Sequence, residues 1–413
     1  MKNIDQAKKP SGKLTNNVIA LGLVSLFNDA SSEIIYPLLP VFLTGVLGVS
    51  IQFIGLIEGI TESASSLLKY PAGWITDRVG KRKWMVVIGY GIASAIRPFL
   101  AMATAGWQVL SLRFLDRFGK GLRSAPRDAL IADSVSSDAR GLAFGFHRAM
   151  DHLGAIIGSL TAAWLVVYFA GDIRKVFWIA ALPAFIGFVI LIIAVKEKKT
   201  AESTSANPNP GPEAARTADP ASIEVKPFDQ NFKAYLAVLL LFTLGNSSDA
   251  FLLLKARDSG VSIAAIPILW AALHLSKTVS SLIGGSLSDR FGRKRLIIAG
   301  WIVYAAIYAG FAFSSTKVEI WALFIIYGIY FGLTEGVEKA FVADLVPASV
   351  RGSAYGLYNL IIGIGALPAS LLMGFLWQRF NAPTALMTGA SFSVLAVALL
   401  VSSVSERQKT SSF

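Results

Sequence analysis

The segment GWITDRVGKRK at residues 73–83 occurs again as GSLSDRFGRKR at residues 285–295, an offset of 212 residues, and this repetition decides the predicted fold. A second pair, IADSVSSDARGLAFG at 131–145 and VADLVPASVRGSAYG at 342–356, repeats with an offset of 211 residues. Both pairs place charged residues beside long apolar runs. Two nearly equal offsets indicate that the chain consists of two related halves.

The composition is that of a membrane protein. Of the 413 residues, 54% are hydrophobic and 15% are charged, and the mean hydropathy is +0.58. Soluble domains carry about 25% charged residues. We attribute the formal net charge of +12 to Lys and Arg in cytoplasmic loops, not to nucleic-acid binding. The absence of cysteine excludes disulfides, thiolate metal sites and a thiol nucleophile.

Apolar runs of about 20 residues, the length that crosses a bilayer, predict twelve membrane helices. We expect the first six at 17–47, 53–76, 84–104, 107–131, 141–169 and 176–196, and the second six at 233–256, 263–288, 296–314, 320–345, 352–377 and 384–404. Residues 198–230 are rich in Pro, Ala, Ser and charge, which predicts a flexible cytoplasmic linker. The expected protein is all-α, with pseudo-symmetric six-helix bundles at 17–197 and 231–405, a polar N-terminus at 1–16 and a tail at 406–413.

The positions of positive charges predict the orientation. They concentrate after the second and eighth helices, at Arg78, Lys81, Arg82, Lys83, Arg290, Arg293, Lys294 and Arg295. The opposite connections, such as GVLGVSIQ, are nearly uncharged. Because Lys and Arg favour cytoplasmic loops, we expect both termini in the cytoplasm of a bacterial-type inner membrane. Two related six-helix units predict a substrate site between them, near the midplane.

The doubled block G-x-x-x-D-R-x-G-K/R-R/K resembles the signature loop of the major facilitator superfamily. Arg117 and Gly121, in RFGKG, resemble its R-x-x-x-G pattern in helix 4. The resemblance covers nearly the whole chain. It implies two bundles that rock about a cavity lined by helices 1, 4, 7 and 10, and secondary active transport, not enzyme catalysis. One departure concerns helix 5, GFHRAMDHLGAIIGSL, which lacks the Gly-Pro pattern usual in drug–proton antiporters of this superfamily.

The resemblance also implies that the repeated loops latch the cytoplasmic side when the cavity faces outward. Glycines allow tight turns and close helix contacts, and the aspartates can accept hydrogen bonds from arginine. Arg127-Asp128 aligns with Glu338-Lys339 in inverted charge order, so pairing across the halves would close a cytoplasmic gate. The predicted gating residues are Gly73, Asp77, Arg78, Gly80, Arg127, Asp128, Gly285, Asp289, Arg290, Gly292, Glu338 and Lys339. For the Lys and Arg residues, a purely topogenic role is the alternative.

Several predicted spans carry polar or charged residues near their midpoints. A charge at membrane depth costs several kcal/mol unless it is paired or hydrated, so it usually faces the bundle interior. The predicted substrate-binding residues are Tyr36, Arg117, Lys120, Asp151, Asn246, His274, Lys277 and Glu335. The alternative for the charged stripe of helix 4 is a structural network with helices 2 and 5.

Four acids are predicted to couple transport to protons: Asp29, Glu33, Glu62 and Asp249. Asp29, Glu33 and Asp249 have no cation one turn away on their own helix near the midplane, which leaves them free to change protonation. A salt bridge to Arg117 or Lys120 is the alternative. Sodium coupling stays open, because Asn, Asp and Ser oxygens would suit it. We expect no cofactor or metal, and the absence of a Walker-type loop argues against ATP-driven transport.

The sequence thus predicts a proton-coupled transporter of a small polar or charged solute. The basic residues of helix 4 favour an anionic or zwitterionic solute, since arginine recognises carboxylate and phosphate. The first alternative is a proton antiporter that exports cationic drugs or toxic metabolites, with Asp29, Glu33 and Asp249 as the cation site. The second is a non-transporting receptor or sensor on the same scaffold. We expect a monomer whose partners are the solute and the lipid bilayer.

Overall fold

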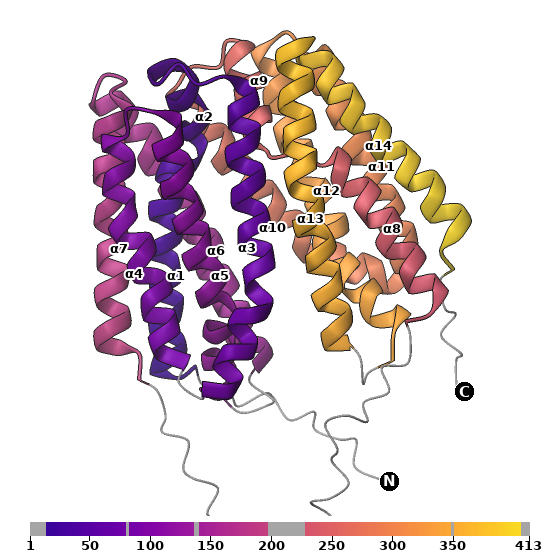
Figure 1. Ribbon diagram of the computed structural model, residues 1–413, viewed down its shortest axis with the longest axis horizontal. Coiled ribbons are helices and arrows are strands. Elements are labelled where there is room, and N and C mark those ends of the chain that lie inside the picture. The colour runs from indigo at the N-terminus through magenta and orange to yellow at the C-terminus, as the bar shows by residue number, and fades with distance from the viewer. Residues whose placement is uncertain (1–13, 80–81, 136–139, 197–227, 348–350, 406–413) are drawn as a thin grey trace, which may run out of the picture.

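The computed structural model describes residues 14–79, 82–135, 140–196, 228–347 and 351–405, and its secondary structure there is helical (Figure 1). The first half contains α1 (Asn16–Ile35), η1 (Tyr36–Leu38), α2 (Leu39–Val41), η2 (Phe42–Val46), α3 (Ile51–Val79), α4 (Arg82–Met102), α5 (Gly106–Asp133), α6 (Arg140–Tyr168) and α7 (Ile173–Ala194). The second contains α8 (Gln230–Gly245), α9 (Ala250–Asp258), α10 (Ala265–Phe291), α11 (Arg293–Phe313), α12 (Lys317–Leu345), α13 (Arg351–Arg379) and α14 (Ala382–Ser403).

The helix positions agree with the predicted spans. Every predicted span end lies within three residues of an observed one, when α1 to η2 and α8 to α9 are each taken as one span. Within the described residues, nine spans are long and apolar enough to cross a membrane. The remaining long helices α3, α5 and α10 carry charged residues such as Glu58, Lys120 and Lys277, which lower their hydropathy. The described chain is therefore compatible with twelve spans, and the predicted linker lies almost wholly outside it.

Side chains in the connections determine where helices begin. Asp172 accepts a hydrogen bond from the backbone N–H of Arg174 (3.1 Å) at the start of α7. Asn381 accepts one from the backbone of Thr384 (2.8 Å) at the start of α14. These caps pair N–H groups that the first turn of a helix leaves without a partner.

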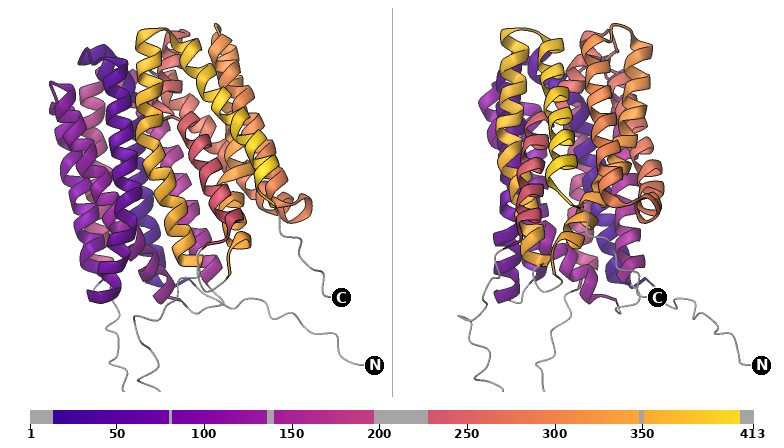
Figure 2. Two further views of the ribbon diagram at one scale, coloured as in Figure 1. Left: turned by 45° about the vertical axis from the view of Figure 1, so that its right-hand side comes forward. Right: turned by 90° about the vertical axis from the view of Figure 1, so that its right-hand side faces the viewer.

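The helices form two groups, which lie side by side in Figures 1 and 2. In the first group, α1 packs against α6 and α7, and α4 packs against α5 and α7. In the second, α10 and α11 pack against α12, and α14 packs against α8 and α11. The two groups meet along α3 with α13 and along α6 with α10. Glycine permits the closest packing: a Cβ at Gly158 of α6 would lie 2.2 Å from the carbonyl oxygen of Ala30 in α1.

An asparagine ties the first and last helices of each group together at one end. Asn17 donates to the carbonyl of Lys196 (2.7 Å), and Asn231 donates to the carbonyl of Ser405 (2.8 Å). The two groups contact each other from mid-membrane to the opposite end, as in the bond from Ser63 to the carbonyl of Gly363 (2.6 Å). The groups diverge toward the end that carries the asparagine clamps (Figure 1).

The first span of each half is interrupted. The first bends at Tyr36-Pro37, where α1 gives way to the 3-10 segment η1, in line with the prolines in its sequence. The seventh was predicted as a continuous helix, but it stops at Gly245 and resumes at Ala250. The intervening Asn-Ser-Ser-Asp favours non-helical backbone, because these short polar side chains compete for backbone hydrogen bonds. Asn246 there has φ −94° and ψ 78°.

Candidate functional site

A polar cavity of about 520 Å³ lies between the two groups of helices. Its walls come from α1, α3 and α5 on one side and from α8, the break after α8, α10, α12 and α13 on the other. The charged and aromatic residues that line it are Glu33, Tyr36, Glu58, Glu62, Arg117, Lys120, Phe242, Asp249, Trp270, His274, Lys277, Tyr327, Tyr330, Phe331, Glu335, Glu338 and Tyr358.

The cavity brings together ten of the twelve residues predicted to bind the solute or to couple protons. These are Glu33, Tyr36, Glu62, Arg117, Lys120, Asn246, Asp249, His274, Lys277 and Glu335. They come from different helices of both halves, which supports their selection by depth in the membrane. Their individual roles stay predictions.

Three carboxylates of the cavity are held by uncharged donors. Glu33 accepts a hydrogen bond from the indole N–H of Trp270 (2.7 Å), and Asp249 accepts one from the hydroxyl of Tyr327 (2.8 Å). Glu338 accepts from Trp301 (3.0 Å) and from Tyr358 (2.8 Å). No Lys, Arg or His nitrogen of the described chain lies within 4 Å of these three groups.

Two other carboxylates form ion pairs. Arg113 lies 3.5 Å from Glu58, which also accepts a hydrogen bond from Ser248 of the opposite half (3.0 Å). Lys277 lies 3.4 Å from Glu335, and its ammonium group is 4.0 Å from the ring centre of Phe331. These pairs neutralise charges that would otherwise be costly at membrane depth.

Arg117 and Lys120 differ from these paired cations. Both line the cavity from α5, and neither has a carboxylate within 4 Å among the described residues. The Nε of Arg117 is buried without a hydrogen-bond partner. Glu62 lines the cavity too and is exposed to it, but it forms no ion pair with either cation. Salt bridges from Arg117 or Lys120 to Glu33 and Asp249, the alternative to a role in proton coupling, are absent among the described residues.

Aromatic residues of α12 and neighbouring helices form a wall that sequence reasoning missed. Tyr327 and Tyr330 stack with ring centres 5.6 Å apart, and Phe331 meets Tyr327 edge-on at 5.0 Å. Trp270 contacts Tyr36 across the halves, with ring centres 5.2 Å apart. Tyr327, Tyr330 and Phe331 precede Glu335 and Glu338 at helical spacing. The sequence could therefore have placed them on the same face of α12 as the two glutamates. Glu58, one turn before Glu62, could have been found in the same way.

His274 lies in the cavity wall with both ring nitrogens buried and without hydrogen-bond partners. Its ring meets Trp270 edge-on, with ring centres 5.2 Å apart. It aligns with Glu62 across the sequence repeat, and both residues line the same cavity. Among the described residues, the imidazole of His274 therefore has no hydrogen-bond partner.

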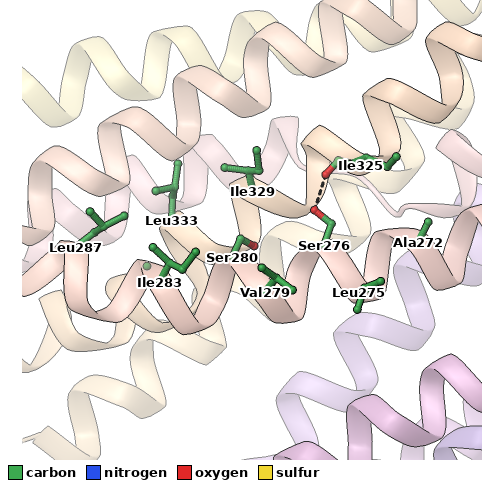
Figure 3. Close-up of a pocket in the computed structure, with 11 residues that line it drawn as sticks. Ala272, Leu275, Ser276, Val279, Ser280, Ile283, Leu287, Ile325, Ile329 and Leu333 are labelled. Carbon is green, nitrogen blue, oxygen red and sulfur yellow. Dashed lines mark hydrogen bonds between the residues drawn. The ribbon is translucent and has the colours of Figure 1, made fainter.

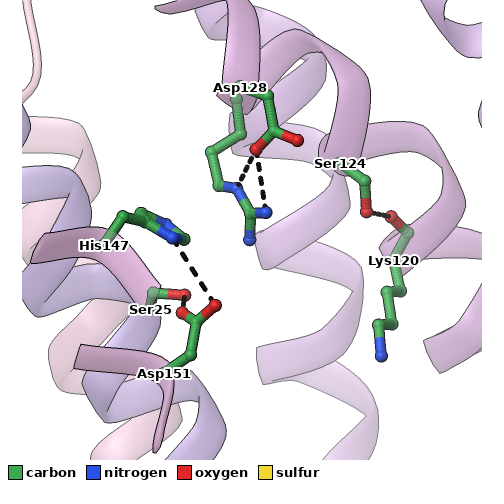
Figure 4. A network of polar contacts seen from close by, with 7 residues as sticks. Ser25, Lys120, Ser124, Asp128, His147 and Asp151 are labelled. Carbon is green, nitrogen blue, oxygen red and sulfur yellow. Dashed lines mark hydrogen bonds and ion pairs between the residues drawn. The ribbon is translucent and has the colours of Figure 1, made fainter. Parts of the chain in front are cut away.

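Asp29 and Asp151 do not line the cavity. Asp29 accepts a hydrogen bond from the side-chain amide of Asn28 (3.0 Å). The side-chain oxygen of Asn28 in turn accepts one from the buried Arg97 (2.8 Å). Asp151 of α6 accepts from Ser25 and lies 3.5 Å from the Nδ1 of His147 (Figure 4). The two acids thus belong to a network inside the N-terminal half, where α1, α4 and α6 meet, and a direct contact of Asp151 with a solute in the cavity is not supported.

The predicted gate is only partly described. Arg127 bonds to its neighbour Asp128 (2.9 Å), and Glu338 points into its own bundle, so the predicted pairing across the halves is absent among the described residues. The reason is that the halves touch at the other end of the molecule.

The other predicted gating residues are described in part. Lys339 is exposed, as is Arg290, whose guanidinium carbon lies 5.4 Å from the ring centre of Phe291. Gly292 ends α10 with φ +90°, the turn expected of glycine. The surroundings of Gly73 and Gly285, the side chains of Asp77, Arg78 and Asp289, and all of Gly80 lie outside what the structure describes.

A second cavity, between α10 and α12, is apolar (Figure 3). Its serines are already satisfied: Ser276 donates to the carbonyl of Ile325 (2.6 Å) and Ser280 to that of Gly328 (2.7 Å). The other lining residues, such as Leu275, Val279 and Ile329, are exposed apolar side chains. This surface offers nothing to bind a polar solute.

The sequence matches the family described as Major Facilitator Superfamily over residues 21–365 and again over residues 234–412. The chain belongs to the major facilitator superfamily. An uncharacterized transporter of this superfamily from Methanocaldococcus jannaschii is 32% identical over 405 residues, which cover 97% of this chain and 98% of that protein. The chain is therefore a multi-pass membrane transporter and not an enzyme.

More distant relatives have names that refer to different transported compounds. The cis,cis-muconate transport protein of Acinetobacter baylyi is 22% identical over 332 residues, which cover 78% of each chain. The multidrug resistance protein MdtH of Salmonella arizonae is 24% identical over 347 residues, covering 84% of this chain and 82% of that one. A crystal structure of the nucleoside transporter NupG has the same fold, with a TM-score of 0.72 and 15% identity over 94% of this chain and 99% of that one.

Proposed function

We propose that this transporter moves a small anionic or zwitterionic solute and couples its movement to protons. The observation that carries the proposal is the pair Arg117 and Lys120, which face the cavity without a carboxylate within 4 Å among the described residues. Cations at membrane depth need a counter-charge, and arginine binds carboxylate and phosphate groups in a two-bond geometry. A solute anion would supply that counter-charge.

The carboxylates nearby favour a zwitterion over a simple anion. Glu62 shares the N-terminal wall with Arg117 and Lys120 and forms no ion pair with any described residue. A solute ammonium group could bind there while its carboxylate meets the two cations. The name of the muconate relative supports an anionic group in the cargo.

Proton coupling is assigned first to Glu33. Its bond from Trp270 (2.7 Å) joins α1 of one half to α10 of the other. When the halves separate at this end, Glu33 loses this donor and meets water, and both changes alter how tightly a carboxyl group holds its proton. Asp29, Glu62 and Asp249 are the further candidates. The proposal includes cytoplasmic termini, a bacterial-type inner membrane and a monomeric state.

A second candidate function is proton-driven export of cationic compounds. The cavity wall contains six acidic residues, Glu33, Glu58, Glu62, Asp249, Glu335 and Glu338, against the three cations Arg117, Lys120 and Lys277. Its aromatic wall could bind cations through their rings, and one relative is named for multidrug resistance. The first candidate is favoured because, among the described residues, Arg117 and Lys120 have no carboxylate within 4 Å, whereas Glu33, Asp249 and Glu338 already accept hydrogen bonds from neutral donors.

The test is a thermal-shift screen of the purified protein with organic acids, sugar phosphates, amino acids and cationic drugs, followed by flux in liposomes. The proposal expects an anionic or zwitterionic solute to stabilise the wild type. Arg117→Gln should abolish this stabilisation. The control variant Arg379→Gln, at the exposed end of α13, should retain it. It also expects flux to respond to an imposed pH gradient. Stabilisation only by cationic drugs, with loss in Glu62→Gln but not in Arg117→Gln, would establish the second candidate instead.

A further inference from the structure

The break in the seventh span leaves backbone oxygens without partners beside the cavity. α8 ends at Gly245 and α9 begins at Ala250. Among the described residues, no backbone or side-chain group donates a hydrogen bond to the carbonyl groups of Asn246 or Ser247. Backbone carbonyls inside a membrane span are otherwise paired within their helix. The segment therefore presents two unused acceptors at membrane depth.

Two buried hydroxyl groups lie beside this segment. Among the described residues, the hydroxyls of Ser247 and Tyr308 form no hydrogen bond of regular geometry, although these residues are only 5% and 0% exposed. Tyr308 stacks on Tyr304, with ring centres 4.1 Å apart, and the hydroxyl of Tyr304 donates to the carbonyl of Gly245 (2.9 Å). The hydroxyl of Tyr308 lies near the hydroxyls of Ser247, Tyr304 and Tyr327. Several buried hydroxyl oxygens therefore gather at the break, and those of Ser247 and Tyr308 have lone pairs that could bind a cation.

Asp249 adds a negative charge without a counter-ion. One of its oxygens accepts from Tyr327 (2.8 Å), and no cationic nitrogen of the described chain lies within 4 Å. The cation that interacts with it from farther away, Lys277, is paired with Glu335 at 3.4 Å. Carboxylate, hydroxyl and carbonyl oxygens together form a donor set suited to a hard cation. A single carboxylate suits one positive charge, and the described residues hold no cluster of three His, Cys, Asp or Glu that would bind a divalent metal.

We propose that this break binds a sodium ion, with Asp249, Ser247, Tyr308 and the carbonyl groups of Asn246 and Ser247 as its ligands. Interrupted spans are places where membrane transporters hold ions, because unwound backbone oxygens face a cavity there. The ion would fix α9 relative to α8 and α11. The next residue, Ser248, donates to Glu58 of the other half (3.0 Å), so the ion also stabilises the closed end of the cavity. This site is separate from the proton assigned to Glu33.

The test follows thermal unfolding of the purified protein in NaCl, KCl or choline chloride at constant ionic strength. The unfolding temperature of the wild type is expected to rise with sodium concentration until the site is saturated. Choline should produce no such rise, and potassium should produce it only at higher concentration. Ser247→Ala and Tyr308→Phe are expected to raise the half-saturating sodium concentration at least about tenfold, since even an outer-shell partner of a metal site is worth that much. Asp249→Asn is expected to abolish the response.

Tyr235→Phe is the matched control. It removes another buried, unpartnered hydroxyl from the same bundle, near Phe341 (ring centres 5.1 Å) and away from the break. It should keep the wild-type sodium response, as should Glu33→Gln, whose effect belongs to proton coupling. An identical response to sodium and choline in wild type, as expected if water fills the site, overturns the proposal. Equal responses of Tyr308→Phe and Tyr235→Phe, or equal effects of sodium and potassium, overturn it as well.

Discussion

The two walls of the cavity hold their carboxylates in different ways. On the N-terminal wall, Glu58 is paired with Arg113 at 3.5 Å, and two more cations, Arg117 and Lys120, have no carboxylate within 4 Å among the described residues. On the C-terminal wall, Glu335 is paired with Lys277 at 3.4 Å, but Asp249 and Glu338 are bound by tyrosine and tryptophan donors. An ion pair fixes the charge of both partners, because neutralising one leaves the other unpaired. A carboxylate held by neutral donors can lose its charge and keep its contacts.

This difference suggests a division of roles. The N-terminal wall has permanent charge and is suited to recognise a charged solute. On the C-terminal wall, Asp249 and Glu338 can change their charge by binding a proton or an ion without breaking a salt bridge. Glu33 belongs to the first wall by sequence, but its donor is Trp270 of the second, which makes it the link between the two. Replacing acids by their amides in each wall tests the comparison directly.

The largest effect is expected from Glu58→Gln. Arg113 and Glu58 have side chains only 6% and 8% exposed, so the variant leaves a buried guanidinium without its carboxylate. The expected loss of unfolding free energy is about 3 kcal/mol, the low end of the range for breaking a buried ion pair. Denaturant or thermal unfolding in detergent measures it. The double variant Glu58→Gln, Arg113→Gln should recover part of the loss, and an unchanged stability in the single variant would remove the contrast between the walls.

The second effect concerns recognition. Arg117→Gln is expected to weaken binding of the transported anion about 100-fold, which corresponds to about 2.7 kcal/mol, within the range for hydrogen bonds to charged groups. Tyr330→Phe, on the opposite wall, removes one neutral hydroxyl and should weaken binding less than about tenfold. Isothermal titration with the solute found by screening provides both affinities. Equal losses in the two variants would contradict the assignment of charge recognition to the N-terminal wall.

Much of the fold could be predicted from the sequence. Span ends were located within three residues because apolar runs stop at charged clusters, glycine or capping residues such as Asp172. The break at Asn246–Asp249 was missed because apolar residues flank it and the run is long enough for one span. Its helix-breaking residues were visible, but their effect depends on Tyr304 and Tyr327, which bond to the segment from other helices.

The cavity was predicted less completely than the fold. Ten residues selected by their depth in the membrane line the cavity, since a midplane charge must avoid lipid, but their roles stay predictions. Depth does not give the rotation of a helix about its axis, so Asp151 was assigned to the cavity although it faces Ser25 and His147. Aromatic residues such as Tyr327 carry no charge that marks them as interior. The gate pairing stays a prediction, because it requires closure at the end where the two groups of helices are apart in this structure.

The third effect concerns coupling. Glu33→Gln should keep the contact with Trp270, since an amide oxygen accepts the same hydrogen bond, but it removes the proton-binding group. Solute binding is expected to change little, whereas accumulation in liposomes under a gradient of one pH unit should fall by up to about tenfold, the factor that one unit supplies to a single coupled proton. Exchange of labelled solute without a gradient is the control. Undiminished gradient-driven accumulation would exclude Glu33 as the coupling residue.

The smallest effect is expected from Glu338→Gln, the counterpart of Glu58→Gln on the C-terminal wall. The glutamine oxygen can accept from Trp301 and from Tyr358 as Glu338 does, and no cation within 4 Å among the described residues loses a partner. The amide N–H group needs a new acceptor, so a loss of about 1 kcal/mol or less in unfolding free energy is expected. Tyr358→Phe, which deletes one of the two bonds, should cost about as much. If the unfolding free energy fell nearly as much as in Glu58→Gln, the negative charge of Glu338 would itself stabilise the bundle. The carboxylates of both walls would then be charged groups that the fold requires, and the contrast between the walls would be lost.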